Sequence, residues 1–248
     1  MKFIITALVS ASAALASAQF NNDVIHARVF NDAPGSTLTV TNTFPGLVEF
    51  SDSNLYNASG YANRHIWDLS PDGTANSTFG TTDYWDVSFG ITLNSTGPAA
   101  LDKEAGFILS NSNFGDSQFI VKNDGEVAMF GGAFTFHQFY APNVGGDYQL
   151  GTTGLMELKY FNNGSANMLT ASFTYNNVLT SFTDATTINP GTNIGGYGQF
   201  QITNTVGVGD SGDAIFSNIN AAPEPASMVA LGLGALALIR RRRIAKRS

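Results

Sequence analysis

Strict alternation of apolar and polar residues is the pattern that most limits how this chain can fold. In the segment 87–93 every odd position is apolar, which is the period of a β-strand with one buried face. The same period recurs at 37–43, 104–110, 118–122, 126–130, 134–140, 155–161, 169–175, 198–203 and 213–219. Before residue 223 no window has a helical period, so the chain is predicted to be all-β.

Turn residues separate these segments. Asn123-Asp124-Gly125 and Asn162-Asn163-Gly164 each stand between two short runs and predict hairpins. Many short strands with frequent turns are typical of a two-sheet antiparallel sandwich. The segment 51–82 is less regular, and we expect long loops there. No run rich in proline, serine or charge marks a boundary, so residues 19–222 are predicted to form one domain.

The first 18 residues have the layout of a signal peptide. Lys2 precedes an apolar segment at 3–15, and Ala16-Ser17-Ala18 supplies small residues two apart. Signal peptidase is therefore expected to recognise Ala16 and Ala18 and to cleave before Gln19. The chain is predicted to be exported.

The last 26 residues, 223–248, form a second processing segment. Pro223-Glu224-Pro225 precedes 14 uncharged residues at 226–239, which as a helix would reach about 21 Å against a hydrocarbon core of about 30 Å. Arg240, Arg241, Arg242 and Arg243 follow and favour the cytoplasmic side. We expect a short apolar helix that holds the protein briefly in the inner membrane, with an ordinary C-terminal anchor as the alternative.

This tail resembles a PEP-CTERM sorting signal. The resemblance rests on Pro223-Glu224-Pro225-Ala226-Ser227, on the glycine- and alanine-rich apolar run at 231–236, and on the terminal arginines. It implies an exosortase that processes the tail near the Pro-Glu-Pro in a Gram-negative-type bacterium. It further implies a final location at the cell surface or in the extracellular matrix.

The middle of the chain resembles concanavalin-A-like jelly-roll domains, a group that includes lectins and glucanases. The resemblance covers about 83–220 and rests on the strand-like segments 104–109, 119–122, 125–132, 155–160 and 195–202. It implies a jelly-roll sandwich with a lectin-like face that binds polysaccharide.

Charge and cysteine content exclude several classes of function. Outside the two processing segments the chain has 5 basic and 18 acidic residues, a net charge of about −13 that should repel nucleic acid and anionic lipid. The chain has no cysteine, which excludes thiol catalysis and iron–sulfur clusters. The three histidines, His26, His65 and His137, are too scattered to predict a zinc site.

No catalytic carboxylate motif occurs in the sequence. A glucanase of the jelly-roll type would carry closely spaced carboxylates on one strand, whereas Glu104, Glu126 and Glu157 each stand alone. We therefore expect a protein that is not an enzyme and has no cofactor. The turn Asp210-Ser211-Gly212-Asp213 has too few acidic residues to match a calcium loop.

Aromatic residues at loops and strand ends are the candidates for contact with carbohydrate, because their rings can stack on sugars. They are Tyr61, Trp67, Trp85 and Tyr140. The alternative for each is packing in the core, and the neighbouring His65 belongs either to a pocket or to a loop that Trp67 pins.

The leading hypothesis is thus an exported, non-catalytic surface or matrix protein that binds exopolysaccharide. Two alternatives stay open: a polysaccharide hydrolase or lyase of the same fold, and a purely structural coat or biofilm protein.

Overall fold

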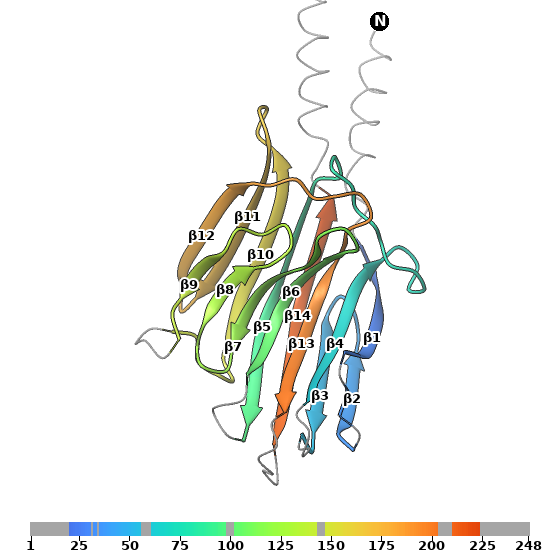
Figure 1. Cartoon of the computed structure of the whole chain (residues 1–248), viewed down its shortest axis with the longest axis vertical. Coiled ribbons are helices and arrows are strands. Elements are labelled where there is room, and N and C mark those ends of the chain that lie inside the picture. Colours follow the sequence, from blue (N-terminus) through green and yellow to red (C-terminus); the bar gives the residue numbers. More distant parts are fainter. Residues whose placement is uncertain are drawn as a thin grey trace, which may run out of the picture.

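In the part of the chain that the structure describes, fourteen β-strands form two antiparallel sheets that pack face to face (Figure 1). The computed structural model describes residues 20–30, 32–33, 35–55, 61–97, 102–142, 147–202 and 210–223, and every regular element in these ranges is a strand. The strands are β1 (Asn22–Phe30), β2 (Thr37–Asn42), β3 (Leu47–Ser53), β4 (Tyr61–Ser70), β5 (Trp85–Thr96), β6 (Lys103–Asn111), β7 (Gly115–Lys122), β8 (Val127–Phe130), β9 (His137–Tyr140), β10 (Thr153–Asn162), β11 (Asn167–Tyr175), β12 (Val178–Ala185), β13 (Asn193–Ile202) and β14 (Ser211–Pro223). The predicted all-β sandwich is confirmed.

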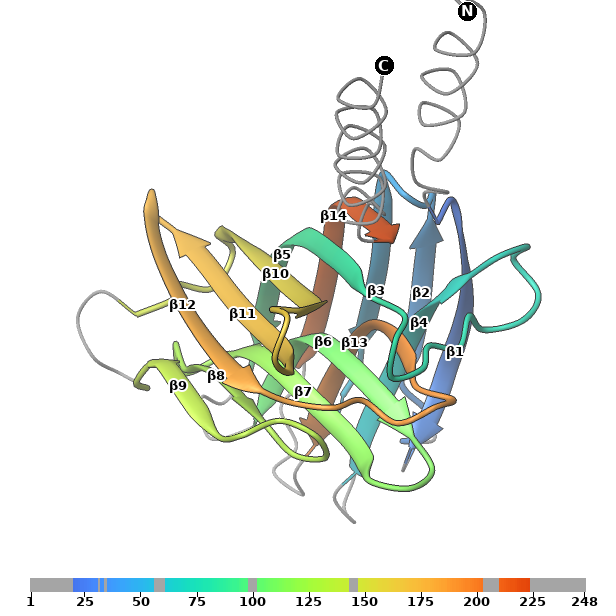
Figure 2. The ribbon, with the colours of Figure 1, turned by 90° about the horizontal axis from the view of Figure 1, so that it is seen from above.

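The two sheets have seven strands each. Sheet A has the order β1-β4-β13-β6-β7-β8-β9, and sheet B has the order β12-β11-β10-β5-β14-β3-β2. Figure 2 shows the two layers edge-on, with the chain crossing repeatedly between them. The last two strands lie in the middle of the sheets, where β13 joins β4 to β6 and β14 joins β5 to β3. The fold therefore depends on pairings that are distant in sequence.

The predicted loop at 51–82 is the main error in the expected fold, because β4 runs through it as an inner strand of sheet A. Its side chains are buried on both sides of the sheet, from Asn63 and His65 to Asp68 and Ser70. Polar residues at buried positions conceal the period-two pattern. The edge strands β1 and β12 were also missed, whereas the segment 87–93 lies within β5, as expected.

Aromatic rings from both sheets meet in the core. Trp67 of β4 contacts Phe89 of β5 and Phe216 of β14 edge-on, with ring centroids 5.7 Å apart in each pair. Phe89 and Phe216 are themselves 5.2 Å apart, and all three side chains are fully buried. Large buried rings in these geometries contribute more than their area alone, so this trio fastens sheet A to sheet B.

A glycine pair on β13 lets that strand lie close to β4. A Cβ atom at Gly195 would be 1.8 Å from the carbonyl oxygen of Trp67, and one at Gly196 would be 2.5 Å from its indole nitrogen. Neither position has room for a side chain. The spacing between β4 and β13, and with it the outer face of sheet A, depends on these two glycines.

No helix among the described residues is long and apolar enough to cross a membrane. The expected apolar helix at 226–239 and the signal peptide at 1–18 lie outside the described residues.

Replacement of Phe216 by alanine tests the packing between the sheets. We expect the free energy of unfolding, measured with a chemical denaturant, to fall by about 3–5 kcal/mol, because the change opens a cavity between two fixed layers. Val178→Ala is the control, since Val178 is 55% exposed and should change the value by less than about 0.5 kcal/mol. Equal effects of the two changes would contradict the role given to the aromatic trio.

Candidate functional site

One row of residues crosses the outer face of sheet A. His26 of β1 pairs with Ile66 of β4, Ile66 pairs with Tyr197 of β13, and Tyr197 pairs with Gly106 of β6. Paired residues point to the same side of a sheet, so His26 and Tyr197 share a face at a backbone separation of roughly 10 Å. On this face Ile108, Ile120 and Tyr197 form an apolar cluster separate from the main core.

Sheet A curves toward this outer face. Arg64 is aligned through β13 with Glu104, whereas Asp116 is aligned with Ser110, six residues further along β6. In a flat sheet that offset alone would be about 20 Å. Nevertheless Arg64 Nη1 and Asp116 Oδ2 are 2.7 Å apart. The face is therefore concave, which explains why Tyr197 is fully buried there.

Arg64 lies across the middle of the concave face. Its Nε donates a hydrogen bond of 2.7 Å to Gln199 Oε1, and its guanidinium carbon is 5.6 Å from the centroid of the Tyr197 ring. On the other side the same carbon is 5.3 Å from the ring of Phe30, which is 52% exposed. The face thus offers a cation between a buried phenol and an exposed aromatic ring.

Glu104 lies beside Tyr197 at one end of the face. Its Oε1 accepts a hydrogen bond of 3.0 Å from the Tyr197 hydroxyl and one of 3.2 Å from Gln199 Nε2. Burial raises the pKa of Glu104 above its ordinary value, although the bond from Tyr197 opposes the change. Burial, and then the charge of Glu104, raise the pKa of Tyr197 well above its usual value. Glu104, which stands alone on its strand in the sequence, is thus a buried carboxylate with a side-chain partner.

A histidine, a carboxylate and an amide form a hydrogen-bonded group near the other end. His26 Nε2 is 3.0 Å from Asn76 Oδ1 and 3.5 Å from Asp68 Oδ2, and Asn76 Nδ2 donates to Asp68 Oδ2 at 2.8 Å. The amide oxygen of Asn76 and an ionised Asp68 both accept, so they favour a proton on Nε2 of His26 and the tautomer in which Nδ1 has the lone pair. The His26 side chain is 37% exposed, so this base is accessible from solvent.

Asp68 is an unusual carboxylate. Burial raises its pKa to about 6, and the nearby His26 and Asn76 offset only part of that effect. Its Oδ1 atom has no hydrogen-bond partner within the described part of the chain. Titratable groups with shifted pKa values are common at functional sites, and Asp68 and Glu104 are two such groups on one face.

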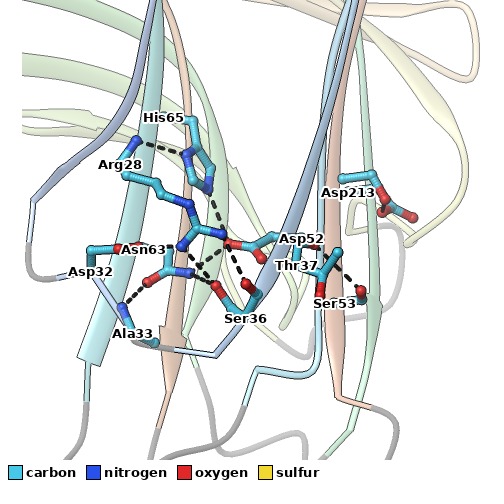
Figure 3. Close-up of polar contacts among 11 residues, drawn as sticks. Arg28, Asp32, Ala33, Ser36, Thr37, Asp52, Ser53, Asn63, His65 and Asp213 are labelled. Carbon is cyan, nitrogen blue, oxygen red and sulfur yellow. Dashed lines mark hydrogen bonds and ion pairs between the residues drawn. The ribbon is translucent and has the colours of Figure 1, made fainter.

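A second polar group lies between the sheets (Figure 3). Asp52 Oδ2 accepts from Asn63 Nδ2 at 2.5 Å and lies 3.2 Å from His65 Nε2, while the backbone N–H of Arg28 donates to His65 Nδ1 at 3.1 Å. Burial raises the pKa of Asp52, but the bonds from His65 and Asn63 outweigh it and the pKa is lowered. Asp52, Asn63 and His65 are fully buried, so we interpret the group as a clamp that joins β1, β3 and β4. His65 therefore belongs neither to an open pocket nor to a loop.

Two of the four aromatic residues proposed to contact carbohydrate lie in the core instead. Trp67 and Trp85 are fully buried, so their expected exposure was wrong. Each lies on a strand whose inward side chains build the core. Tyr140 is half-buried and packs against Phe173, with centroids 5.9 Å apart. Tyr61 begins β4, but its side chain is outside the described residues.

The residues proposed for processing lie almost entirely outside the described residues. These are Ala16, Ala18, Glu224, Pro225, Arg240, Arg241, Arg242 and Arg243. Pro223 is the exception, as the last residue of β14, paired with Trp85.

The turn that was considered for calcium separates its two carboxylates. Asp210 forms an ion pair with Lys103 inside the sandwich, whereas Asp213 accepts a hydrogen bond of 2.6 Å from Ser51 Oγ on the outer side of sheet B.

Comparison with known proteins identifies the tail and the fold. Residues 221–243 match the PEP-CTERM protein-sorting motif, so the chain carries an exosortase sorting signal and is an exported protein. No curated protein matches the chain.

Similar solved structures include the alginate lyase AlgAT5 from polysaccharide lyase family 7, with 14% identity, coverage of 77% of this chain and 83% of that chain, and a TM-score of 0.49. Lectin I from Ulex europaeus has 12% identity, coverage of 81% and 98%, and a TM-score of 0.43. An alginate lyase from Corynebacterium sp. has 15% identity, coverage of 77% and 82%, and a TM-score of 0.48. These proteins are similar to the chain in fold.

The expectation that the protein is not an enzyme is corrected by this comparison. It rested on the absence of a carboxylate motif within one strand, yet the similar structures include polysaccharide lyases. A jelly-roll of this kind is a fold that enzymes also use. Single residues on separate strands can also meet on one face, as His26, Arg64, Glu104 and Tyr197 do here.

The raised pKa of Asp68 predicts a dependence of stability on pH. Because the folded pKa of about 6 lies above the ordinary value of 3.8 for an aspartate, the folded protein binds this proton more tightly than the unfolded chain does. The resulting stabilisation is complete below the unfolded value and is lost as the pH rises through about 6. Thermal unfolding at pH 4 and at pH 7 measures this effect. Asp68→Asn should reduce the difference in melting temperature between the two pH values.

Asp83→Asn, a change of a carboxylate in a surface turn, should leave that dependence intact. An unaltered pH profile in the Asp68 variant would contradict the assignment of the raised pKa.

Proposed function

We propose that the protein is a polysaccharide lyase that acts on uronate-containing chains at the concave face of sheet A. The observation that carries the proposal is the placement of an accessible histidine base, His26, in the same row as Tyr197, whose ring lies against Arg64. An elimination next to a carboxylate needs a base, a cation and a proton donor, and this face holds all three.

In the proposed reaction Nδ1 of His26 takes the proton from C5 of the uronate. The electron pair forms the C4=C5 double bond, the bond between C4 and the glycosidic oxygen breaks, and that oxygen takes a proton from Tyr197. Arg64 stabilises the carboxylate as negative charge develops on it. Asp68 and Asn76 hold the His26 ring in the tautomer that the step requires. Phe30 provides an exposed ring for stacking on a neighbouring sugar.

The substrate has to displace a contact within the protein. Arg64 is paired with Asp116, whose side chain is 37% exposed, and Tyr197 is buried beneath Arg64. A sugar carboxylate could replace Asp116 as the partner of Arg64. In the proposed reaction this change moves Arg64 away from Tyr197 and uncovers its hydroxyl group. The net charge of about −13 also opposes the approach of a polyanion, so salt should raise the rate of association by screening.

Product formation tests the proposal directly. Purified protein is incubated with alginate and other uronate polysaccharides, and the ultraviolet absorbance of the new C4=C5 bond is followed. Alginate comes first because lyases of similar fold act on it by name. His26→Ala should lower kcat about 10²–10⁴-fold, the usual contribution of a general base.

His137→Ala is the matched control. His137 belongs to the edge strand β9 and its ring stacks on Phe182 at 4.1 Å, so its loss should leave kcat within a small factor once the folded fraction is equal. Absence of unsaturated product from every uronate polysaccharide would overturn the lyase proposal, as would equal losses in the two variants.

The sorting motif supports release to the cell surface or extracellular matrix after a transient hold in the inner membrane. Replacement of Pro223-Glu224-Pro225 by three alanines should leave the protein in the inner-membrane fraction, because the processing enzyme would no longer recognise the tail. Fractionation and immunoblotting measure this. Normal release of the variant would count against the assigned route.

A further inference from the structure

Lys103 and Asp210 are in contact inside the sandwich, away from the concave face. Lys103 is the first residue of β6 in sheet A, and Asp210 directly precedes β14 in sheet B. Nζ of Lys103 lies against Oδ1 of Asp210. The Lys103 side chain is fully buried and that of Asp210 is 2% exposed. The pair therefore spans the two sheets at the end where β5 finishes and β6 begins (Figure 1).

The surroundings hold both groups in one arrangement. Nζ of Lys103 also donates a hydrogen bond of 2.7 Å to the backbone oxygen of Thr96, the last residue of β5. Gly97 leaves the room that the carboxyl group needs, because a Cβ atom there would be 2.7 Å from Cγ of Asp210. The backbone oxygen of Asp210 accepts a bond of 3.0 Å from the N–H of Leu55, so the residue is fixed at its main chain too.

We propose that Lys103 and Asp210 are joined by an amide bond between Nζ of the lysine and Cγ of the aspartate. A buried ion pair retains the desolvation cost of two charges, whereas an amide has no charge to desolvate. Two reacting groups held in contact also gain a large effective concentration. The site takes no external ligand or oxidant, because both reactants belong to the chain.

The reaction balances without a co-reactant. A proton passes from the ammonium group to the carboxylate, which leaves a neutral amine and a carboxylic acid. The amine attacks Cγ, the new N–C bond forms, and the tetrahedral intermediate loses the acid hydroxyl with a proton as water. The carbonyl oxygen of Thr96 orients the remaining N–H through the bond that it already makes.

The cross-link would join residues 107 positions apart. It would tie the start of β6 to the start of β14, so the two sheets would remain connected after unfolding. An exported chain commonly gains such a constraint from disulfides, and this chain has no cysteine.

Peptide mapping of the full-length protein tests the proposal. The protein is denatured, digested with trypsin and analysed by tandem mass spectrometry. The expected product is a branched peptide that contains both Lys103 and Asp210 and is lighter than its two linear components by one water molecule. Trypsin should not cleave after Lys103, because the acylated side chain is no longer recognised.

Two variants control the result. Asp210→Ala should give only linear peptides and cleavage after Lys103. Asp210→Asn should give a branched peptide identical to that of the natural protein, since attack on the asparagine amide releases ammonia and leaves the same bond. Linear peptides with an unmodified Lys103 in the folded natural protein would overturn the proposal, whatever the variants show.

Discussion

Burial on both sides of sheet A is the constraint on which the rest of the molecule depends. One side packs on sheet B through Trp67, Phe107 and Phe200, and the other carries the buried cluster of Ile108, Ile120 and Tyr197. Among the described strands, no second sheet covers the side that carries this cluster. The curvature of sheet A lets its own side chains enclose the cluster. Curvature brings Arg64 to Asp116 and gathers residues from several strands on the face at which we propose that substrate binds.

The sequence predicted the part of the fold in which only one side of a strand is buried. β5, β10 and β11 alternate between core and solvent, and their alternation was read directly. The same pattern wrongly predicts a loop at β4, because Asn63, His65 and Asp68 are both polar and buried. Their burial is made possible by hydrogen bonds to Asp52 and Asn76, partners that no local pattern can indicate.

The candidate site could not be found from sequence for a related reason. Its members are single residues on β1, β4, β6 and β13, and only the register between these strands places His26, Arg64 and Tyr197 on one face. The nearest sequence feature is the glycine-rich segment 195–202, which predicts a strand but no functional residue. The tail required no such pairing, because its signal is contiguous, and the motif match confirms it.

The position of β14 has a consequence for the order in which the domain can be assembled. β14 is the last of the described strands, yet it separates β5 from β3 in the middle of sheet B. Until it arrives, sheet B consists of two unconnected halves with open edges. The sorting motif begins at residue 221, inside this strand, and the backbone oxygen of Ala221 also accepts the N–H of Phe20 at 3.1 Å. Completion of sheet B, the start of the sorting motif and the hydrogen bond from Phe20 therefore share a single stretch of backbone. A chain without that stretch would leave the edges of β3 and β5 open together.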